Sequence, residues 1–167
     1  MIPLLPLEAH KETQMTVHYY PIAASVLLLA FTAGAQEKKI ERSALPPAVE
    51  KAVQVETKGA TIKGFAEERE HGKTFYEVET IVDGRTRDVL FAHDGTVAEV
   101  EEEVALDSLP PTVQAGLKKK AGGVSINKVE SLTKKGKLVS YEGHIKRSGK
   151  AAEIQVGPDG GNLTREE

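Results

Sequence analysis

The stretch that decides the fold is Leu45-Pro46-Pro47-Ala48-Val49, because it recurs 64 positions later as Leu109-Pro110-Pro111-Thr112-Val113. Self-similarity at a fixed spacing indicates a repeated structural unit. Further matches follow at the same offset or one residue later: Ile62 with Ile126, Tyr76-Glu77 with Tyr141-Glu142, and Asp94-Gly95 with Asp159-Gly160. We therefore predict two copies of one unit, spanning residues 44–104 and 105–167.

Each copy is predicted to open with a helix. Proline suits the first helical turn, because its φ is fixed near the helical value and its missing N–H would be unpaired there anyway. The helices should therefore begin near Pro46 and Pro110, and Gly59 and Gly122 should stop them. Apolar residues at the spacing of one helix face are Leu45, Val49, Ala52 and Val53 in the first copy and Leu109, Val113, Gly116 and Leu117 in the second.

After each helix the apolar pattern changes to a period of two, which is typical of strands. In both copies the alternation places the tyrosine, Tyr76 or Tyr141, on the side that faces the helix. Asp-Gly and Ser-Gly pairs should form the turns, because glycine readily adopts a positive φ. These pairs are Asp83-Gly84, Asp94-Gly95, Ser148-Gly149 and Asp159-Gly160.

The predicted fold is of the α+β class. A unit of about 60 residues hides only about 60% of its unfolded surface and would be marginally stable alone. The two tandem units are therefore expected to share one antiparallel sheet, with both helices on one face. The other face is left for a partner or for solvent.

The amino terminus reads as a targeting segment. Residues 19–35 carry no charge, and residues 22–31 have about the length of a signal-peptide hydrophobic region. Small residues at Ala33 and Ala35 stand at the −3 and −1 positions of a cleavage site. We predict a signal peptide over 1–35, with an uncleaved membrane anchor or a buried core helix as the alternatives.

The mature chain is then expected in the periplasm or the medium. Residues 36–43 are predicted to be a linker before the first copy. The true start is either Met1 or Met15, and the membrane would be contacted only through an uncleaved signal segment.

Composition and motifs argue against several classes of function. The 167 residues carry 22 Lys+Arg and 25 Asp+Glu, whereas a nucleic-acid-binding domain would be strongly basic. The chain has no Cys, so disulfides, thiolate metal sites and a cysteine nucleophile are excluded. His71, His93 and His144 lack metal-binding spacing, and no G-x-S-x-G motif occurs. We predict no enzyme activity, no cofactor, no metal and no nucleic-acid partner.

The repeated features resemble those of a known family. The Leu-Pro-Pro openings, the Tyr-Glu strands and the closing hydrophobic-x-hydrophobic-x-x-Asp-Gly at 89–95 and 154–160 resemble the PepSY and PepSY-like domains of exported bacterial proteins, over about 43–167. Such domains look like half of the β-lactamase inhibitor protein fold, a saddle-shaped sheet with a concave binding face. The resemblance implies a non-catalytic domain that binds or inhibits a secreted or cell-wall enzyme such as a peptidase.

The sheet face away from the helices is the candidate binding surface for a protein or peptide partner in the cell envelope. Of its residues, Phe75, Ile81 and Leu90 are the predicted apolar anchors. The full predicted set is Phe75, Glu77, Glu79, Ile81, Leu90, Glu142, His144, Lys146 and Gln155. The alternatives are scattered surface hydrophobics, a register error of one residue, a small-ligand or peptide sensor, and an enzyme of unrecognised type.

A further acidic cluster, Glu99, Glu101, Glu102 and Glu103, follows a predicted hairpin. A charged, solvated outer edge that prevents edge-to-edge pairing of sheets is the favoured interpretation. A site for a cation or a basic partner is the alternative.

Overall fold

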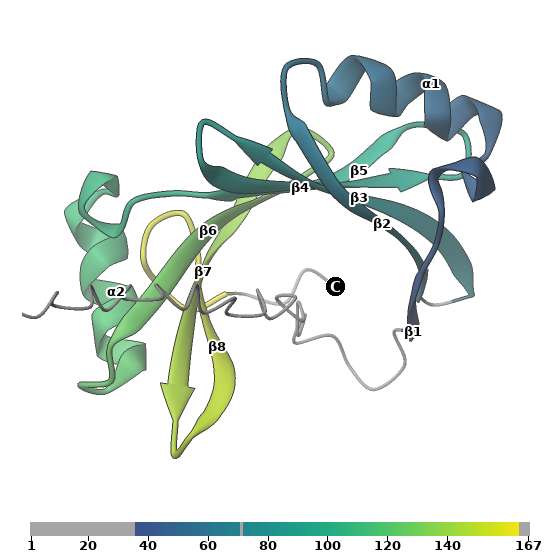
Figure 1. Cartoon of the computed structure of the whole chain (residues 1–167). Helices are drawn as coiled ribbons and strands as arrows, with labels where there is room; N and C mark the ends of the chain where they lie inside the picture. Colours follow the sequence, from purple (N-terminus) through teal and green to yellow (C-terminus); the bar gives the residue numbers. More distant parts are fainter. Residues whose placement is uncertain (1–35, 71, 164–167) are drawn as a thin grey trace, which may run out of the picture.

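The computed structural model describes residues 36–70 and 72–163, which form one antiparallel sheet of eight strands and two helices (Figure 1). The strands lie in the sheet in their sequence order. The predicted α+β class, with one shared sheet, is confirmed. The elements are β1 (Gln36–Lys39), the 3-10 turn η1 (Arg42–Ala44), α1 (Pro47–Glu56), β2 (Thr61–Glu70), β3 (Lys73–Val82), β4 (Arg85–Ala92), β5 (Val97–Glu103), η2 (Leu106–Ser108), α2 (Pro111–Ala121), β6 (Ile126–Lys134), β7 (Lys137–Arg147) and β8 (Lys150–Val156).

Each helix connects two neighbouring strands of the sheet: α1 lies between β1 and β2, and α2 lies between β5 and β6. The order η1–α1–β2–β3–β4 recurs as η2–α2–β6–β7–β8. Figure 1 shows the sheet bending away from both helices, so that the face without helices is concave. No helix in the described ranges is long and apolar enough to cross a membrane. The predicted signal peptide, 1–35, lies outside the described residues.

The helix boundaries follow the proline and glycine signals with one exception. Each helix begins at the second proline of its Leu-Pro-Pro motif, Pro47 or Pro111. Gly122 ends α2 in the left-handed conformation at φ 63°, as predicted. The first helix ends at Glu56, three residues before Gly59, which adopts a positive φ of 84°. At this end the Thr57 hydroxyl donates a hydrogen bond of 2.8 Å to the carbonyl of Val53.

Two hydrophobic cores lie between the sheet and the helices, one under each. The first contains Leu45, Val49, Val53, Tyr76, Val78, Val89 and Phe91, and the second contains Leu109, Val113, Leu117, Val129 and Val156, with Tyr141 packed against it. Val49, Val53, Val113 and Leu117 have no exposed surface. The tyrosine side of each copy therefore faces its helix, as predicted.

Two of the Asp-Gly turns are pressed against the helices. A Cβ on Gly95 would lie 2.6 Å from the carbonyl oxygen of Ala48, and a Cβ on Gly160 would lie 2.2 Å from that of Thr112. Both distances are shorter than any real contact, and both glycines have a positive φ, so only glycine fits. This close approach fixes each helix against the end of its own hairpin.

Three features of the fold differ from the sequence-based expectation or were missed. Residues 36–39, placed in a linker, form β1, which pairs with β2. A further two-residue turn at Lys135-Gly136 joins β6 to β7. The third feature is β5, which is not an outer edge: it pairs with β4 on one side and with β6 on the other.

Candidate functional site: the concave sheet face

The concave face is made of the side chains that alternate with the core residues along each strand. The pairing register brings Glu77 opposite Leu90 on β4 and Glu142 opposite Gln155 on β8. It places the predicted residues together on this one face, without a slip of one residue. These residues are Phe75, Glu77, Glu79, Ile81, Leu90, Glu142, His144, Lys146 and Gln155.

The three predicted apolar anchors lie outside the two hydrophobic cores, but they are not fully exposed. Phe75, Ile81 and Leu90 are half-buried. The reason is the curvature of the sheet, which brings long neighbouring side chains over them: Glu68 lies opposite Phe75, and Leu90 pairs with a glutamate on each side. The anchors are therefore recessed among carboxylates.

The centre of the concave face is acidic, which corrects the interpretation of residues 99–103 as a solvated edge. Glu101 on β5 lies opposite Asp88 on β4, and Asp88 lies opposite Glu79 on β3. Glu101 is only 6% exposed. The expectation failed because β5 is an inner strand, so that alternate residues of the cluster point into the concave face and lose solvent.

Glu101 is the most poorly satisfied of these groups. Its Oε2 atom is buried and has no hydrogen-bond partner. Burial, followed by the charges of Glu142 and Glu130, raises the pKa of Glu101 to about 9. A carboxyl in this state is protonated at neutral pH, because ionisation would add a negative charge to a poorly solvated and already acidic surface.

The pKa values of other carboxyls on the concave face are raised as well. Burial and the nearby charge of Glu68 raise the pKa of Glu77 to about 9. Burial is also the largest cause for Glu68 and Glu142, whose pKa values rise to about 7, and for Asp88, whose pKa rises to about 6. Perturbed titratable groups gather at functional sites, although structural networks perturb them too.

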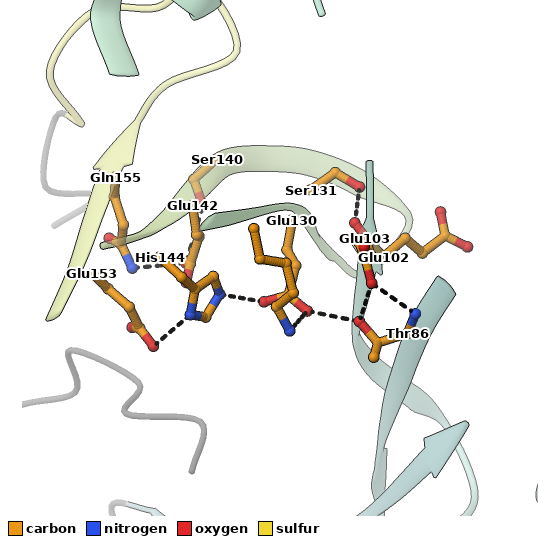
Figure 2. A network of polar contacts seen from close by, with 11 residues as sticks. Thr86, Glu102, Glu103, Glu130, Ser131, Ser140, Glu142, His144, Glu153 and Gln155 are labelled. Carbon is orange, nitrogen blue, oxygen red and sulfur yellow. Dashed lines mark hydrogen bonds and ion pairs between the residues drawn. The ribbon is translucent and has the colours of Figure 1, made fainter. Parts of the chain in front are cut away.

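A polar network crosses the face from β8 to β4 (Figure 2). At its centre Glu130, 1% exposed, accepts contacts from Lys128 Nζ at 2.7 Å and His144 Nε2 at 2.5 Å. Burial opposes ionisation of Glu130, but the hydrogen bonds from His144 and Lys128 outweigh it and hold its pKa below the usual value. Glu130 is thus a buried carboxylate whose charge is balanced.

The network continues on both sides of Glu130. Thr86 on β4 joins Glu130 to Glu103, with hydroxyl contacts of 3.3 Å to each carboxylate. On the other side His144 Nδ1 lies 3.7 Å from Glu153, whose Oε2 is buried without a partner. Figure 2 shows these side chains in one continuous row. The row extends from β4 to β8, so it ties the two halves of the sheet together on the concave side.

One carboxylate group has the spacing to hold a cation. Oxygen atoms of Glu37, Glu77 and Glu79 lie within 4.8 Å of one another. Oxygen ligands suit Ca²⁺ or Mg²⁺. Glu37 is exposed, however, and the Glu77 carboxyl is protonated at neutral pH by its pKa of about 9. The three carboxylates are therefore not a preformed site of full charge.

The three histidines of the predicted mature chain lie in different places. His144 binds Glu130 and Glu153, and the ring centre of His93 lies 6.0 Å from that of Tyr76. His71 lies outside the described residues.

A hollow of about 410 Å³ opens at the edge where β1 leaves β2. Its walls include Lys39, Arg42, Lys63 and Phe65, with Glu79 reaching in from the concave face. The Arg42 guanidinium lies over the ring of Phe65, 6.0 Å from the ring centre, and binds Glu50 at 2.8 Å. This hollow has the size of a small-molecule site.

Sequence reasoning missed Glu68, Asp88, Glu130 and Glu153. The period-two alternation that placed Leu90 on the concave face also contains Asp88 two residues earlier, so the signal was present in β4. For β2 and β6 the apolar pattern is weak, and the sequence did not define these strands. The register across the sheet could not be read without them.

Comparison with known proteins identifies the fold class. No family model and no curated protein matches the chain. Among solved structures, a BLIP-like protein from Bacteroides fragilis is similar with a TM-score of 0.53 at 21% identity, over 72% of this chain and 84% of that one. The chain thus has a fold of the β-lactamase inhibitor protein type.

Two further structures agree. A protein from Bacteroides eggerthii, provisionally described as periplasmic, gives a TM-score of 0.58 at 16% identity, covering 72% of this chain and 86% of that chain. A DUF2874 family protein from Bacteroides ovatus gives 0.56 at 18% identity, covering 72% and 85%. At these identities the likeness shows the fold.

Proposed function

We propose that this chain is an exported, non-catalytic binding protein that captures a protein or peptide of the cell envelope on its concave sheet face. The observation that carries the proposal is the face itself. No helix of the described residues covers it, and it combines recessed apolar side chains with an excess of buried carboxylates. Purely structural surfaces rarely keep so many ionisable groups out of water, because each costs desolvation free energy.

The partner is proposed to be a secreted or cell-wall enzyme such as a peptidase, which the chain would inhibit. The support is the PepSY-like sequence pattern together with the BLIP-like fold of the Bacteroides fragilis structure. Residence in the periplasm or the medium is part of the same proposal. It is supported by the uncharged amino-terminal stretch and by the periplasmic description of the Bacteroides eggerthii protein.

Affinity capture with matched variants tests this function. The purified chain, carrying a carboxyl-terminal tag, is the bait for the exported protein fraction of the host. Substituting Phe75→Ser and Leu90→Ser together should reduce recovery of the captured protein at least about tenfold, because apolar anchors carry much of the binding energy at interfaces. Val55→Ser is the control, since Val55 is 68% exposed on the first helix.

Thermal melting of the same variants distinguishes a loss of binding from a loss of stability. Equal capture by the double variant and the wild-type chain would rule out the concave face. A melting loss in the double variant far above that of the control would mean that Phe75 and Leu90 are core residues. An activity assay of the captured enzyme with added wild-type chain then decides between binding and inhibition.

A second candidate is a sensor of small ligands or peptides, favoured by the 410 Å³ hollow beside β1 and β2. Lys39 and Lys63 would contact an anionic group there, and Phe65 its apolar part. A thermal-shift screen of small carboxylates and peptides tests it. A ligand that stabilises the wild-type chain but not the Lys63→Ala variant would support the sensor, and a hit that stabilises both equally would contradict it.

A further inference from the structure

The unpaired Oε2 atom of Glu101 indicates what kind of group the concave face receives. It lies on the inner strand β5, between Asp88 on β4 and Leu132 on β6. Its side chain is buried, with 6% of its surface exposed, and the Oε2 atom has no hydrogen-bond partner. Buried polar atoms are nearly always paired in folded proteins, so an unpaired one marks a place where a partner group can be added.

Two other carboxylates of the same face are satisfied by basic side chains of the chain itself. Glu130 is paired with Lys128 at 2.7 Å and with His144 at 2.5 Å. Glu99, two residues before Glu101 on the same strand, is paired with Lys134 at 2.5 Å. Where the chain supplies a cation, therefore, the carboxylate is held in an ion pair, and at Glu130 these partners keep the pKa below its usual value.

Around Glu101 the strongest charges are carboxylates instead. They come from Glu142, Glu130, Glu77 and Glu99, and Asp88 faces it across β4. Such surroundings repel an anion and attract a cation. Leu132 lies directly opposite Glu101, and Leu90 lies next to Asp88 along β4 on the same face. These apolar surfaces can cover the methylene stem of a long basic side chain while its charged end reaches the carboxylate.

We propose that the partner of this chain inserts a Lys or Arg side chain into the concave face and that Glu101 accepts its charged end. The inference rests on the proposed function, because it names the chemistry by which that face holds a protein partner. On binding, the added cation favours the ionised form of Glu101, so a proton leaves the carboxyl as the ion pair forms. Glu142 and Asp88, whose pKa values of about 7 and about 6 leave them largely ionised at pH 7.5, strengthen the attraction, which is screened by salt.

A titration with a defined probe tests the inference. Pentalysine is added to the isotopically labelled chain at pH 7.5 and low salt, and backbone amide shifts are followed by NMR. Pentaglutamate and Ca²⁺ alone are added in separate titrations. The variant is Glu101→Gln, and its matched control is Glu102→Gln, which removes a carboxylate from the next residue of the same strand but from the opposite face.

We expect pentalysine to shift amides of β4, β5 and β6 and to bind the Glu101→Gln variant about tenfold more weakly than the wild-type chain, since a charge-assisted hydrogen bond is lost. The Glu102→Gln variant should bind within about twofold of wild type. Calorimetry in two buffers of different ionisation enthalpy should show proton release from the wild-type chain that the Glu101→Gln variant lacks.

Equal affinities for the two variants, or no proton release, would overturn the inference. So would binding of Ca²⁺ alone that depends on Glu101 when pentalysine does not bind, because the site would then take a metal ion. Either result would leave the proposed function standing if Phe75→Ser with Leu90→Ser still abolishes capture. If the double variant captured the partner as well as the wild-type chain does, the proposed function itself would be contradicted.

Discussion

At the residue scale, a few acidic side chains of the concave face lie in unusual surroundings. Glu101 is a buried acid without a hydrogen-bond partner for its Oε2, whereas Glu130, on the neighbouring strand, is a buried acid with two basic partners. Both side chains are buried, so the presence or absence of basic partners explains why their pKa values differ. The pKa of Glu101 rises to about 9, and that of Glu130 lies below its usual value.

Glu101→Gln should stabilise the chain at alkaline pH. The folded-state pKa is raised, so the wild-type carboxyl costs nothing below its unfolded pKa and destabilises the fold increasingly as the pH rises towards about 9. Each pH unit between the unfolded and the folded pKa costs about 1.4 kcal/mol, so replacing the carboxyl should raise the free energy of unfolding at pH 8.5 by several kcal/mol and raise the Tm with it. Thermal melts from pH 4 to pH 9 check this. Curves that stay parallel instead of converging at acid pH would contradict it.

Gly160→Ala should be strongly destabilising. Gly160 combines a φ of 82° with a Cβ position 2.2 Å from the carbonyl oxygen of Thr112, so the α2 helix must move. The expected loss is about 3 kcal/mol, measured by urea unfolding. Gly149 is the matched control, because its φ is 81° but a Cβ there meets no atom within 4 Å. Gly149→Ala should cost only about 1 kcal/mol. Equal losses would show that the helix contact is unimportant.

At the scale of the elements, each helix is held by apolar packing and by the turn beneath it. In α1 the residues Val49 and Val53 are fully buried, while Val55 points to solvent with 68% of its surface exposed. The helix has Pro46 as its N-cap and lacks a side-chain cap there, so its stability depends on tertiary contacts.

Val53→Ala should therefore lower the free energy of unfolding by about 2 kcal/mol, the transfer and cavity terms of a buried valine. Val55→Ala should change it by less than about 0.5 kcal/mol, because that side chain loses little contact on truncation. Val53 and Val55 are two residues apart on the same helix. Urea denaturation of the two variants measures the difference between their free energies of unfolding. Similar losses would mean that α1 does not pack as the structure describes.

The elements also show how far sequence alone could go. The Leu-Pro-Pro motifs, the Asp-Gly turns and the alternation around Tyr76 predicted both helices and the core side of β3, because proline, glycine and a period of two act locally. The position of β5 could not be predicted in this way. Its acidic residues suggest an edge, but only the pairing of β5 with both β4 and β6 shows that they are buried.

At the scale of the whole molecule, the concave face accumulates protons in the folded state. Six of its carboxyls have pKa values raised mainly by burial: to about 9 for Glu77 and Glu101, about 7 for Glu68 and Glu142, about 6 for Asp88, and above the usual value for Glu153. Partner binding and stability should both depend on pH for this reason.

The Tm of the chain should fall as the pH rises from about 5 to about 9. In this window the folded state binds more protons than the unfolded state, whose carboxyls ionise near pH 4, so each unit of pH removes stability. The low pKa of Glu130 acts in the opposite direction only below its unfolded value. Calorimetric melts at constant ionic strength measure the trend. A Tm that rises over this range would show that the carboxyls are solvated.

The central claim is that a partner binds the concave face, and site-specific photo-cross-linking tests it most directly. A benzoylphenylalanine replaces Phe75 on the concave face in one sample and Val55 on the helix side in another, and each is irradiated in the exported protein fraction. A cross-linked partner is expected from position 75 and none from position 55. A cross-link to the same partner from position 55, with none from position 75, would place the binding surface on the helices and contradict the account.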